Sequence, residues 1–414
     1  MRKIYTGIDI GSDSIKIVVS EIFNNKFHVL ASACVKSNGV HRGLITDVDK
    51  VTACLKTGIN KIESTIGLKI EEAILTVPSN NRKLSVVSGN IEIDADIVTG
   101  TDISNVLSSS VIDKIDEDYE LITTIPIMFS LDDESNILDP KGMTGKYLGV
   151  KAVMVTVPKE NLINVLKVCK LCGIQIKDFI FKTIGDYYEA KGKDTEKELG
   201  AVINVGYETI DVSIFNKGII IKNDIINLGS KNIDKDISYM YGIDLETARD
   251  LKENFSVCSR KYADINDIID VKINTEEKIN INQYELSEVV EARVTELLKL
   301  AKKSINNLTN RKISYIIVTG GITELMGFGY LVENVLGINA STLNITTVGI
   351  RGNKYSSAIG IIKYFYEKLK LRNIDYTMFD ESKMNFALMS NKNNLLNINN
   401  DTIVSKIFGY FTNN

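Results

Sequence analysis

Alternating apolar and polar positions form a pattern that the chain contains twice. The first copy runs from Ile8 to Ile15 and the second from Ile203 to Ile210. In each copy an apolar run leads into a glycine turn with a hydroxyl residue, and apolar/polar alternation leads out of it. This pattern predicts two β-hairpins whose tight turns expose backbone N–H groups. The copies differ where Asp9 of the first corresponds to Asn204 of the second.

The remaining pattern predicts an α/β protein with two lobes, one for each hairpin. Helical spacing covers 47–67, 287–308 and 356–371, and strand-like runs cover 26–36, 73–78 and 313–321. The pattern of residues 84–159 predicts a small α+β unit inserted in the first lobe. Thr101 or Asp102 is expected to cap the helix of this unit. Residues 230–310 are predicted to be mostly helical. We therefore expect a first lobe (1–83, 160–197 and 355–372), the inserted unit (84–159), a second lobe (198–229 and 310–354), a helical subdomain (230–309), a flexible linker (373–400) and a terminal helix (401–414).

The end of the chain has a helical pattern of its own. Apolar residues fall on one stripe of a helix, beyond a segment rich in Asn, Asp, Ser and Lys that predicts a flexible tether. Such a helix suits a membrane surface. The alternative is a peptide that docks on the body of this or another protein. The stripe consists of Ile403, Val404, Ile407, Phe408 and Phe411.

Composition narrows the class of protein. The chain has 414 residues, 44% of them hydrophobic and 25% charged, as in soluble globular proteins of more than one domain. A net charge of −4 gives no general attraction to nucleic acid. The five cysteines predict reduced thiols in a cytosol, and Cys169 and Cys172 are expected to be buried thiols rather than a zinc site. We expect neither a signal peptide nor a membrane-spanning segment.

The glycine turns suggest phosphate binding. Successive N–H groups around Gly11 and Gly206 form anion-binding nests, to which Ser12, Ser14 and Thr209 can add hydroxyl donors. The carboxylate of Asp9 suits a water-mediated contact with Mg²⁺. A strand that ends in Gly320 and Gly321 leaves room for a nucleoside against its backbone. Either hairpin alone can be an ordinary turn, but the repeat favours a shared function.

The order of two phosphate hairpins and a diglycine resembles the actin, sugar kinase and heat-shock chaperone ATPase superfamily. Within it, the chain is similar to the FtsA family of actin-like bacterial division proteins. The resemblance covers about Tyr5 to Tyr366 and the C-terminus, and its most specific motif is Gly142-Met143-Thr144-Gly145 after the inserted unit. It implies an actin-like two-lobed ATPase fold with a small inserted α+β domain in the first lobe.

The resemblance also implies roles for residues and partners. Asp9 matches the metal-side carboxylate, and Lys252 falls near a helix that contacts adenine or ribose. Gly11, Ser12 and Ser14 match the first phosphate loop, Gly206 and Thr209 the second, and Gly320 and Gly321 the adenosine motif. The implied ligands are ATP and Mg²⁺. One implied partner is the C-terminal peptide of the tubulin-like FtsZ, which residues 230–309 receive and which Arg293 and Lys302 can meet. Further copies of the chain are implied partners through residues 84–159. The others are further division proteins and the cytoplasmic face of the membrane.

The second loop departs from the family pattern Asp-x-Gly-Gly-Gly-Thr. Asn204 lacks the charge that attracts Mg²⁺ or accepts a proton, and Glu208 adds a negative side chain beside the expected phosphates. Because phosphoryl transfer depends on positioning water and neutralising charge, we expect ATP binding with slow or absent hydrolysis. The alternatives are an active phosphotransferase or chaperone-type ATPase, or a pilus-assembly relative with the same fold.

Overall fold

Two five-stranded sheets with the same topology form the centre of the molecule. The computed structural model describes residues 2–272 and 278–379. The first sheet has the order β11-β6-β1-β2-β3 and the second β14-β13-β12-β17-β18. In both, an antiparallel hairpin with a third strand is followed by two parallel strands. The strands are β1 (Lys3–Ile10), β2 (Ser14–Phe23), β3 (Lys26–Lys36), β6 (Glu72–Val77) and β11 (Gln175–Phe181), and then β12 (Leu199–Val205), β13 (Ile210–Asn216), β14 (Ile219–Ile226), β17 (Tyr315–Thr319) and β18 (Ala340–Thr342).

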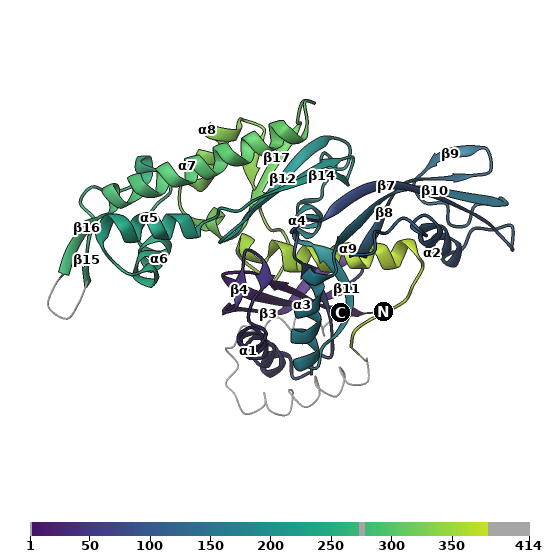
Figure 1. Cartoon of the computed structure of the whole chain (residues 1–414), viewed down its shortest axis with the longest axis horizontal. Coiled ribbons are helices and arrows are strands. Elements are labelled where there is room, and N and C mark those ends of the chain that lie inside the picture. Colours follow the sequence, from purple (N-terminus) through teal and green to yellow (C-terminus); the bar gives the residue numbers. More distant parts are fainter. Residues whose placement is uncertain (1, 273–277, 380–414) are drawn as a thin grey trace.

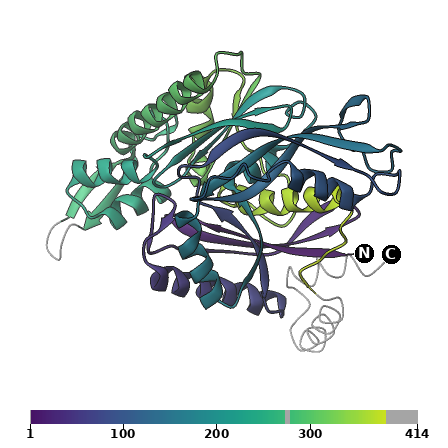
Figure 2. The same ribbon diagram turned by 45° about the vertical axis from the view of Figure 1, so that its right-hand side comes forward.

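Helices separate and cover the two sheets. Helices α4 (Lys182–Ala190) and α9 (Ser356–Leu371) lie between them, and one apolar cluster joins Ile184 and Ile362 to residues of both sheets (Figure 2). Helices α1 (Val48–Ile66) and α3 (Glu160–Leu171) cover the outer face of the first sheet. Helices α7 (Gln283–Leu308) and α8 (Phe328–Leu336) cover that of the second, and α5 (Lys231–Tyr241) and α6 (Leu245–Asn254) extend from it (Figure 1).

Helix α1 shows why the predicted helices form where they do. The Asp47 side chain accepts the Lys50 N–H at 3.0 Å and so satisfies one free donor of the first turn. Gly67 ends the helix with φ 70°, a left-handed conformation that glycine adopts at low cost. Its apolar stripe, including Leu55 and Ile59, is buried against the first sheet. The prediction for 47–67 is therefore confirmed.

The inserted unit is a four-stranded sheet with one helix. Its strands follow the order β7-β10-β8-β9, and α2 packs on them beside the first lobe (Figure 1). The prediction that Thr101 or Asp102 caps this helix is wrong. Thr99 is the N-cap, and Asp102 lies at the third helical position, where its carboxylate accepts the Thr99 N–H in a capping box. The elements are β7 (Lys83–Glu92), α2 (Gly100–Ser109), β8 (Tyr119–Leu131), β9 (Glu134–Ile137) and β10 (Tyr147–Pro158).

The region 230–310 is less helical than predicted. A two-stranded ribbon, β15 (Ile268–Lys272) and β16 (Lys278–Asn282), precedes the long helix. Because the Asn282 side chain accepts the N–H groups of Tyr284 and Glu285, α7 begins at Gln283, one turn before the predicted Ser287. Short elements complete the described part of the chain: β4 (Val40–His41), β5 (Leu44–Ile45) and single 3₁₀ turns at Arg260–Tyr262, Gly321–Glu324 and Asn353–Tyr355.

The start of the predicted flexible linker is packed rather than free. Met378 N–H donates to Ile4 O at 3.0 Å, and Ile4 N–H donates to Thr377 Oγ1 at 2.9 Å. Phe379 is buried in the apolar cluster beneath the first sheet. Residues 373–379 are therefore part of the folded body. The rest of the predicted linker and the predicted membrane stripe, Ile403 to Phe411, lie outside the described residues. Among helices that the structure describes, none is long and apolar enough to cross a membrane.

Candidate functional site

The two predicted hairpins close in the same way. In the first, Gly11 N–H donates to Ser14 O at 3.2 Å, and in the second Gly206 N–H donates to Thr209 O at 2.9 Å. Asp9 pairs with Lys16 across the first hairpin, and Asn204 pairs with Asp211 across the second. The prediction of two equivalent strand–turn–strand units is confirmed.

The hairpins border one cleft between the lobes, with a volume of about 690 Å³. This volume falls within the usual range for small-molecule sites, roughly 300–1,000 Å³. The Gly320-Gly321 turn and helix α6 contribute to the same cleft. All the described residues predicted from the sequence to bind nucleotide or metal line it: Asp9, Gly11, Ser12, Ser14, Gly206, Thr209, Lys252, Gly320 and Gly321.

Two lysines at this cleft were missed by the sequence reasoning. Lys16 lies on β2 and Lys182 begins α4. A Cβ atom added to Gly11 would lie 3.3 Å from Lys16 Nζ and 3.7 Å from Lys182 Nζ, so both ammonium groups gather where the glycine leaves space. Lys16 had a sequence signal, since it lies two residues after Ser14 on the same side of a strand. Lys182 had none, because the fold brings it from a distant segment.

Asp9 is held between these two lysines. Its side chain is 5% exposed, with Oδ1 3.1 Å from Lys182 Nζ and Oδ2 3.7 Å from Lys16 Nζ. Thr76 Oγ1 donates to Oδ1 at 2.8 Å. Burial by itself favours the neutral acid, but the ammonium groups of Lys182 and Lys16 outweigh it and lower the pKa of Asp9. Asp9 is therefore a carboxylate with cationic partners already in place.

Asn204 has a structural partner that explains an amide at this position. Its Nδ2 donates to Asp186 Oδ2 at 2.7 Å. Ser356 and Ser357 at the start of α9 donate to the other oxygen of Asp186, at 2.6 and 2.8 Å. Asp186 is fully buried, and burial raises its pKa to about 6 in spite of these hydrogen bonds. An aspartate at 204 would place a second carboxylate against Asp186 and remove a donor.

Glu208 does not point freely at the expected phosphates. Its Oε1 lies 2.7 Å from Lys231 Nζ, and its Oε2 accepts the Arg42 N–H at 2.6 Å and lies 3.0 Å from His41 Nδ1. His41 and Arg42 belong to the first lobe, whereas Glu208 belongs to the second lobe and Lys231 to the helical subdomain that extends from it. The negative side chain expected beside the phosphates is therefore paired with cations and a backbone donor, and it bridges the two lobes.

Helix α6 adds a second bridge across the cleft. Arg249 lies 2.6 Å from Asp13 Oδ1 in the first hairpin. Lys252, predicted to contact a nucleoside, lines the cleft but is buried with its Nζ 2.6 Å from Asp234. The ring of Tyr207 lies within 6 Å of both cations, at 5.4 and 5.7 Å, in the arrangement of cation–π contacts. This side of the cleft is therefore rich in paired charges.

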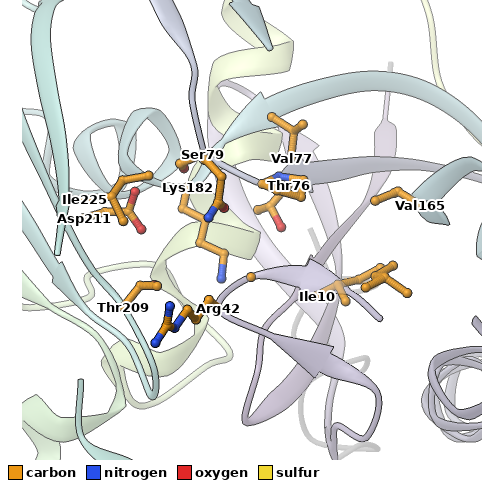
Figure 3. A pocket seen from close by; sticks show the side chains of 14 residues that line it. Ile10, Arg42, Thr76, Val77, Ser79, Val165, Lys182, Thr209, Asp211 and Ile225 are labelled. Atoms are coloured by element: carbon orange, nitrogen blue, oxygen red, sulfur yellow. The ribbon is translucent and has the colours of Figure 1, made fainter. Parts of the chain in front are cut away.

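A small cavity adjoins the main cleft behind the hairpins. Its volume is about 30 Å³, enough for a water molecule. The Lys182 side chain lies between Asp211 and Thr209 of the second lobe and Thr76 and Ile10 of the first (Figure 3). Oδ1 of Asp211 is buried and has no hydrogen-bond partner in the described part of the chain. Lys182 thus belongs to both the cleft and this cavity.

The cleft fits a polyphosphate better than a neutral ligand. Two glycine turns present backbone N–H groups, and the ammonium groups of Lys16 and Lys182 stand beside the first turn. Gly320 has φ 109°, and a Cβ there would lie 2.2 Å from Val205 O, so the diglycine turn requires glycine. Beside it, Gly321 has only Lys354 near its Cβ position, which leaves an open face at the nucleoside end.

Two family models match the chain. "Cell division protein FtsA" matches residues 201–360 and "SHS2 domain inserted in FTSA" matches residues 80–156, together more than half of the chain. Relatives of this chain in several bacteria carry the name "Cell division protein FtsA". The protein of Bacillus subtilis (strain 168) is 26% identical, with 94% of this chain and 90% of the relative covered. That of Staphylococcus epidermidis (strain RP62A) is 29% identical, covering 86% of this chain and 78% of the relative.

Solved structures with little sequence identity share the fold. The "PilM-PilN type IV pilus biogenesis complex" has a TM-score of 0.58 at 14% identity, covering 89% of this chain and 98% of that one. "MreB5 of Spiroplasma citri bound to ADP" has a TM-score of 0.53 at 12% identity, covering 90% of this chain and 99% of that one. Together with the paired hairpins and the inserted unit, these matches show an actin-like α/β fold, and the chain belongs to the FtsA family of cell division proteins.

Proposed function

We propose that this chain is an ATP-binding division protein that polymerises and links FtsZ filaments to the cytoplasmic face of the membrane at the division site. The observation that supports it most is the pair of equivalent hairpins across one cleft in a chain of the FtsA family. The ADP in the MreB5 structure is consistent with a nucleotide in a cleft of this fold.

We infer that the main role of the nucleotide is to control the arrangement of the two lobes, and that it is hydrolysed slowly or not at all. Its phosphates would lie between the hairpins, with Gly11, Ser12 and Ser14 on one side and Gly206 and Thr209 on the other. Asn204 cannot act as a base, and its amide is engaged with Asp186. A ligand that contacts both lobes favours their closed arrangement by its differential affinity for that state.

The remaining units have proposed roles as well. The inserted unit (84–159) would form subunit contacts, and the helical subdomain (230–309) would receive the FtsZ peptide. Arg293 and Lys302 are poor candidates for that contact. The Arg293 guanidinium is paired with Asp236 and Glu296, and Lys302 Nζ donates to Val335 O at 2.6 Å. The terminal residues 401–414, with their apolar stripe, would bind the membrane reversibly as single copies and more firmly as a polymer.

Co-sedimentation tests this proposal. The full chain and a variant lacking residues 400–414 are mixed with vesicles of anionic and neutral phospholipid, with and without FtsZ polymers. The full chain should carry FtsZ to the vesicles, whereas the shortened chain should bind FtsZ but remain in solution. Equal vesicle binding by both forms would contradict the tether. Failure of both to bind FtsZ would contradict the division role and favour a pilus-type relative or another ATPase.

A further inference from the structure

The side chain of Lys182 lies against Asp9 in the cleft between the two hairpins. It begins α4, at the floor of the cleft between the two hairpins, and 22% of it is exposed. Its Nζ lies 3.1 Å from Asp9, the residue that the family pattern marks as the metal-side carboxylate.

Three carboxylates interact electrostatically with this ammonium group, and Asp9 is in direct contact with it. Burial alone would lower the pKa of Lys182, but Asp9, Asp211 and Asp186 outweigh it and raise the pKa. These acids come from β1, β13 and α4, so the fold collects negative charge from both lobes around one lysine. In the second hairpin, the residue that corresponds to Asp9 is the neutral Asn204.

A magnesium ion does not fit this arrangement. Mg²⁺ requires six oxygen ligands at short distance and retains several waters. Oδ1 of Asp9 already binds Thr76 and Lys182, and Lys16 lies near Oδ2. A divalent cation beside Asp9 would stand against two ammonium groups, and like charges repel strongly in a partly buried site.

We propose that the Lys182 ammonium group takes the place of the divalent cation, so that this chain binds a nucleoside triphosphate without Mg²⁺. The inference rests on the proposed nucleotide cleft and deepens it. Lys182 neutralises the acids at the floor of the cleft, and together with Lys16 it presents positive charge to the phosphates. The lysine supplies charge and hydrogen-bond donors but no Lewis-acid metal, which agrees with slow or absent hydrolysis.

Calorimetric titration of ATP into the full chain tests the idea, once with Mg²⁺ in excess and once with EDTA in excess. The dissociation constants of wild type measured in Mg²⁺ and in EDTA should agree within about threefold. This difference in binding free energy is smaller than the contribution of one charge-assisted hydrogen bond. Lys182→Met keeps the length of the side chain and removes its charge. In EDTA it should weaken binding by about tenfold or more, and Mg²⁺ should restore part of the loss. Lys36→Met, an exposed lysine at the rim, is the control and should behave as wild type.

The outcomes separate this inference from the proposed function. If wild type binds ATP only with Mg²⁺, or Lys182→Met stays indifferent to Mg²⁺, the substitution of lysine for metal is overturned while nucleotide binding stands. If folded wild type binds ATP under neither condition, the nucleotide cleft itself is contradicted. The wild-type comparison needs no variant, so a fold defect in Lys182→Met leaves the test intact.

Discussion

Asp186 is the residue where the two halves of the molecule meet. It accepts hydrogen bonds from Asn204 on the second sheet and from Ser356 and Ser357 of α9, and none of its surface is exposed. Three donors compensate in part for the loss of water around the carboxylate. The part of the desolvation cost that these donors do not offset raises the pKa of Asp186 to about 6. From the sequence, Asn204 is only a lost carboxylate; in the structure it is a donor in this network.

The pKa of Asp186 predicts a pH dependence of stability. The folded-state pKa is about 6, against an ordinary 3.8, so between these values the folded chain holds a proton that the unfolded chain releases. The contribution of Asp186 to the free energy of unfolding is therefore largest below pH 4. It decreases by about 3 kcal/mol as the pH rises through 6. Urea unfolding of wild type and Asp186→Asn from pH 4 to 7 measures it. The stability of wild type relative to the variant should fall across this window, and a constant difference would contradict the assignment.

At the scale of elements, α4 and α9 cross in direct backbone contact. A Cβ atom added to Gly360 would lie 1.7 Å from Gly185 O, and one added to Gly185 would lie 2.7 Å from Ser357 O. Glycine at both positions lets the two helices approach closely between the sheets. Because these helices carry Asp186, Lys182 and Ser356, the close crossing positions the floor of the cleft.

Gly360→Ala should therefore destabilise the protein strongly, by about 3 kcal/mol or more, since overpacking here displaces backbone rather than a flexible side chain. The melting temperature measured by circular dichroism reports the loss. Gly192→Ala is a matched control, because nothing lies within 4 Å of its Cβ position, and it should be neutral. Equal melting temperatures for the two variants would show that the helices can separate at no cost.

The elements also show what the sequence can predict. The hairpins and α1 carry local signals, namely apolar/polar alternation, glycine turns and helical spacing of apolar residues, and they were predicted correctly. The ribbon β15–β16 does alternate apolar and polar residues, but each of its strands is only five residues long, and it was missed. Lys182 and the Asn204–Asp186 pair depend on contacts between distant segments. Local pattern cannot show such contacts, so the chemistry of the cleft floor needed the structure.

At the scale of the molecule, charged contacts hold the two lobes together across the cleft. Glu208 binds the Arg42 N–H and Lys231, and Arg249 binds Asp13. Lys36 and Glu246 form a further contact at 2.7 Å, with both side chains more than two-thirds exposed. The partly buried contacts should contribute to lobe closure, whereas the exposed pair should contribute little.

Glu208→Ala should loosen the closed arrangement. The Arg42 N–H loses its acceptor and Lys231 loses its partner, which should cost about 1–3 kcal/mol. Hydrogen–deuterium exchange of a peptide covering residues 40–45 should become faster, while Glu246→Ala should leave it unchanged. If the two variants exchange alike, Glu208 does not bridge the lobes in solution.

The central claim is that a nucleotide's phosphates bind between the two hairpins, beside Lys16. The most direct test is calorimetric titration of ATP into wild type, Lys16→Met and Lys36→Met, each shown to be folded. We expect one ATP per chain for wild type and the rim variant Lys36→Met, and about tenfold or more weaker binding for Lys16→Met, which loses a charge-assisted contact to phosphate. Equal affinity for Lys16→Met and wild type, or no binding by wild type, would contradict the account.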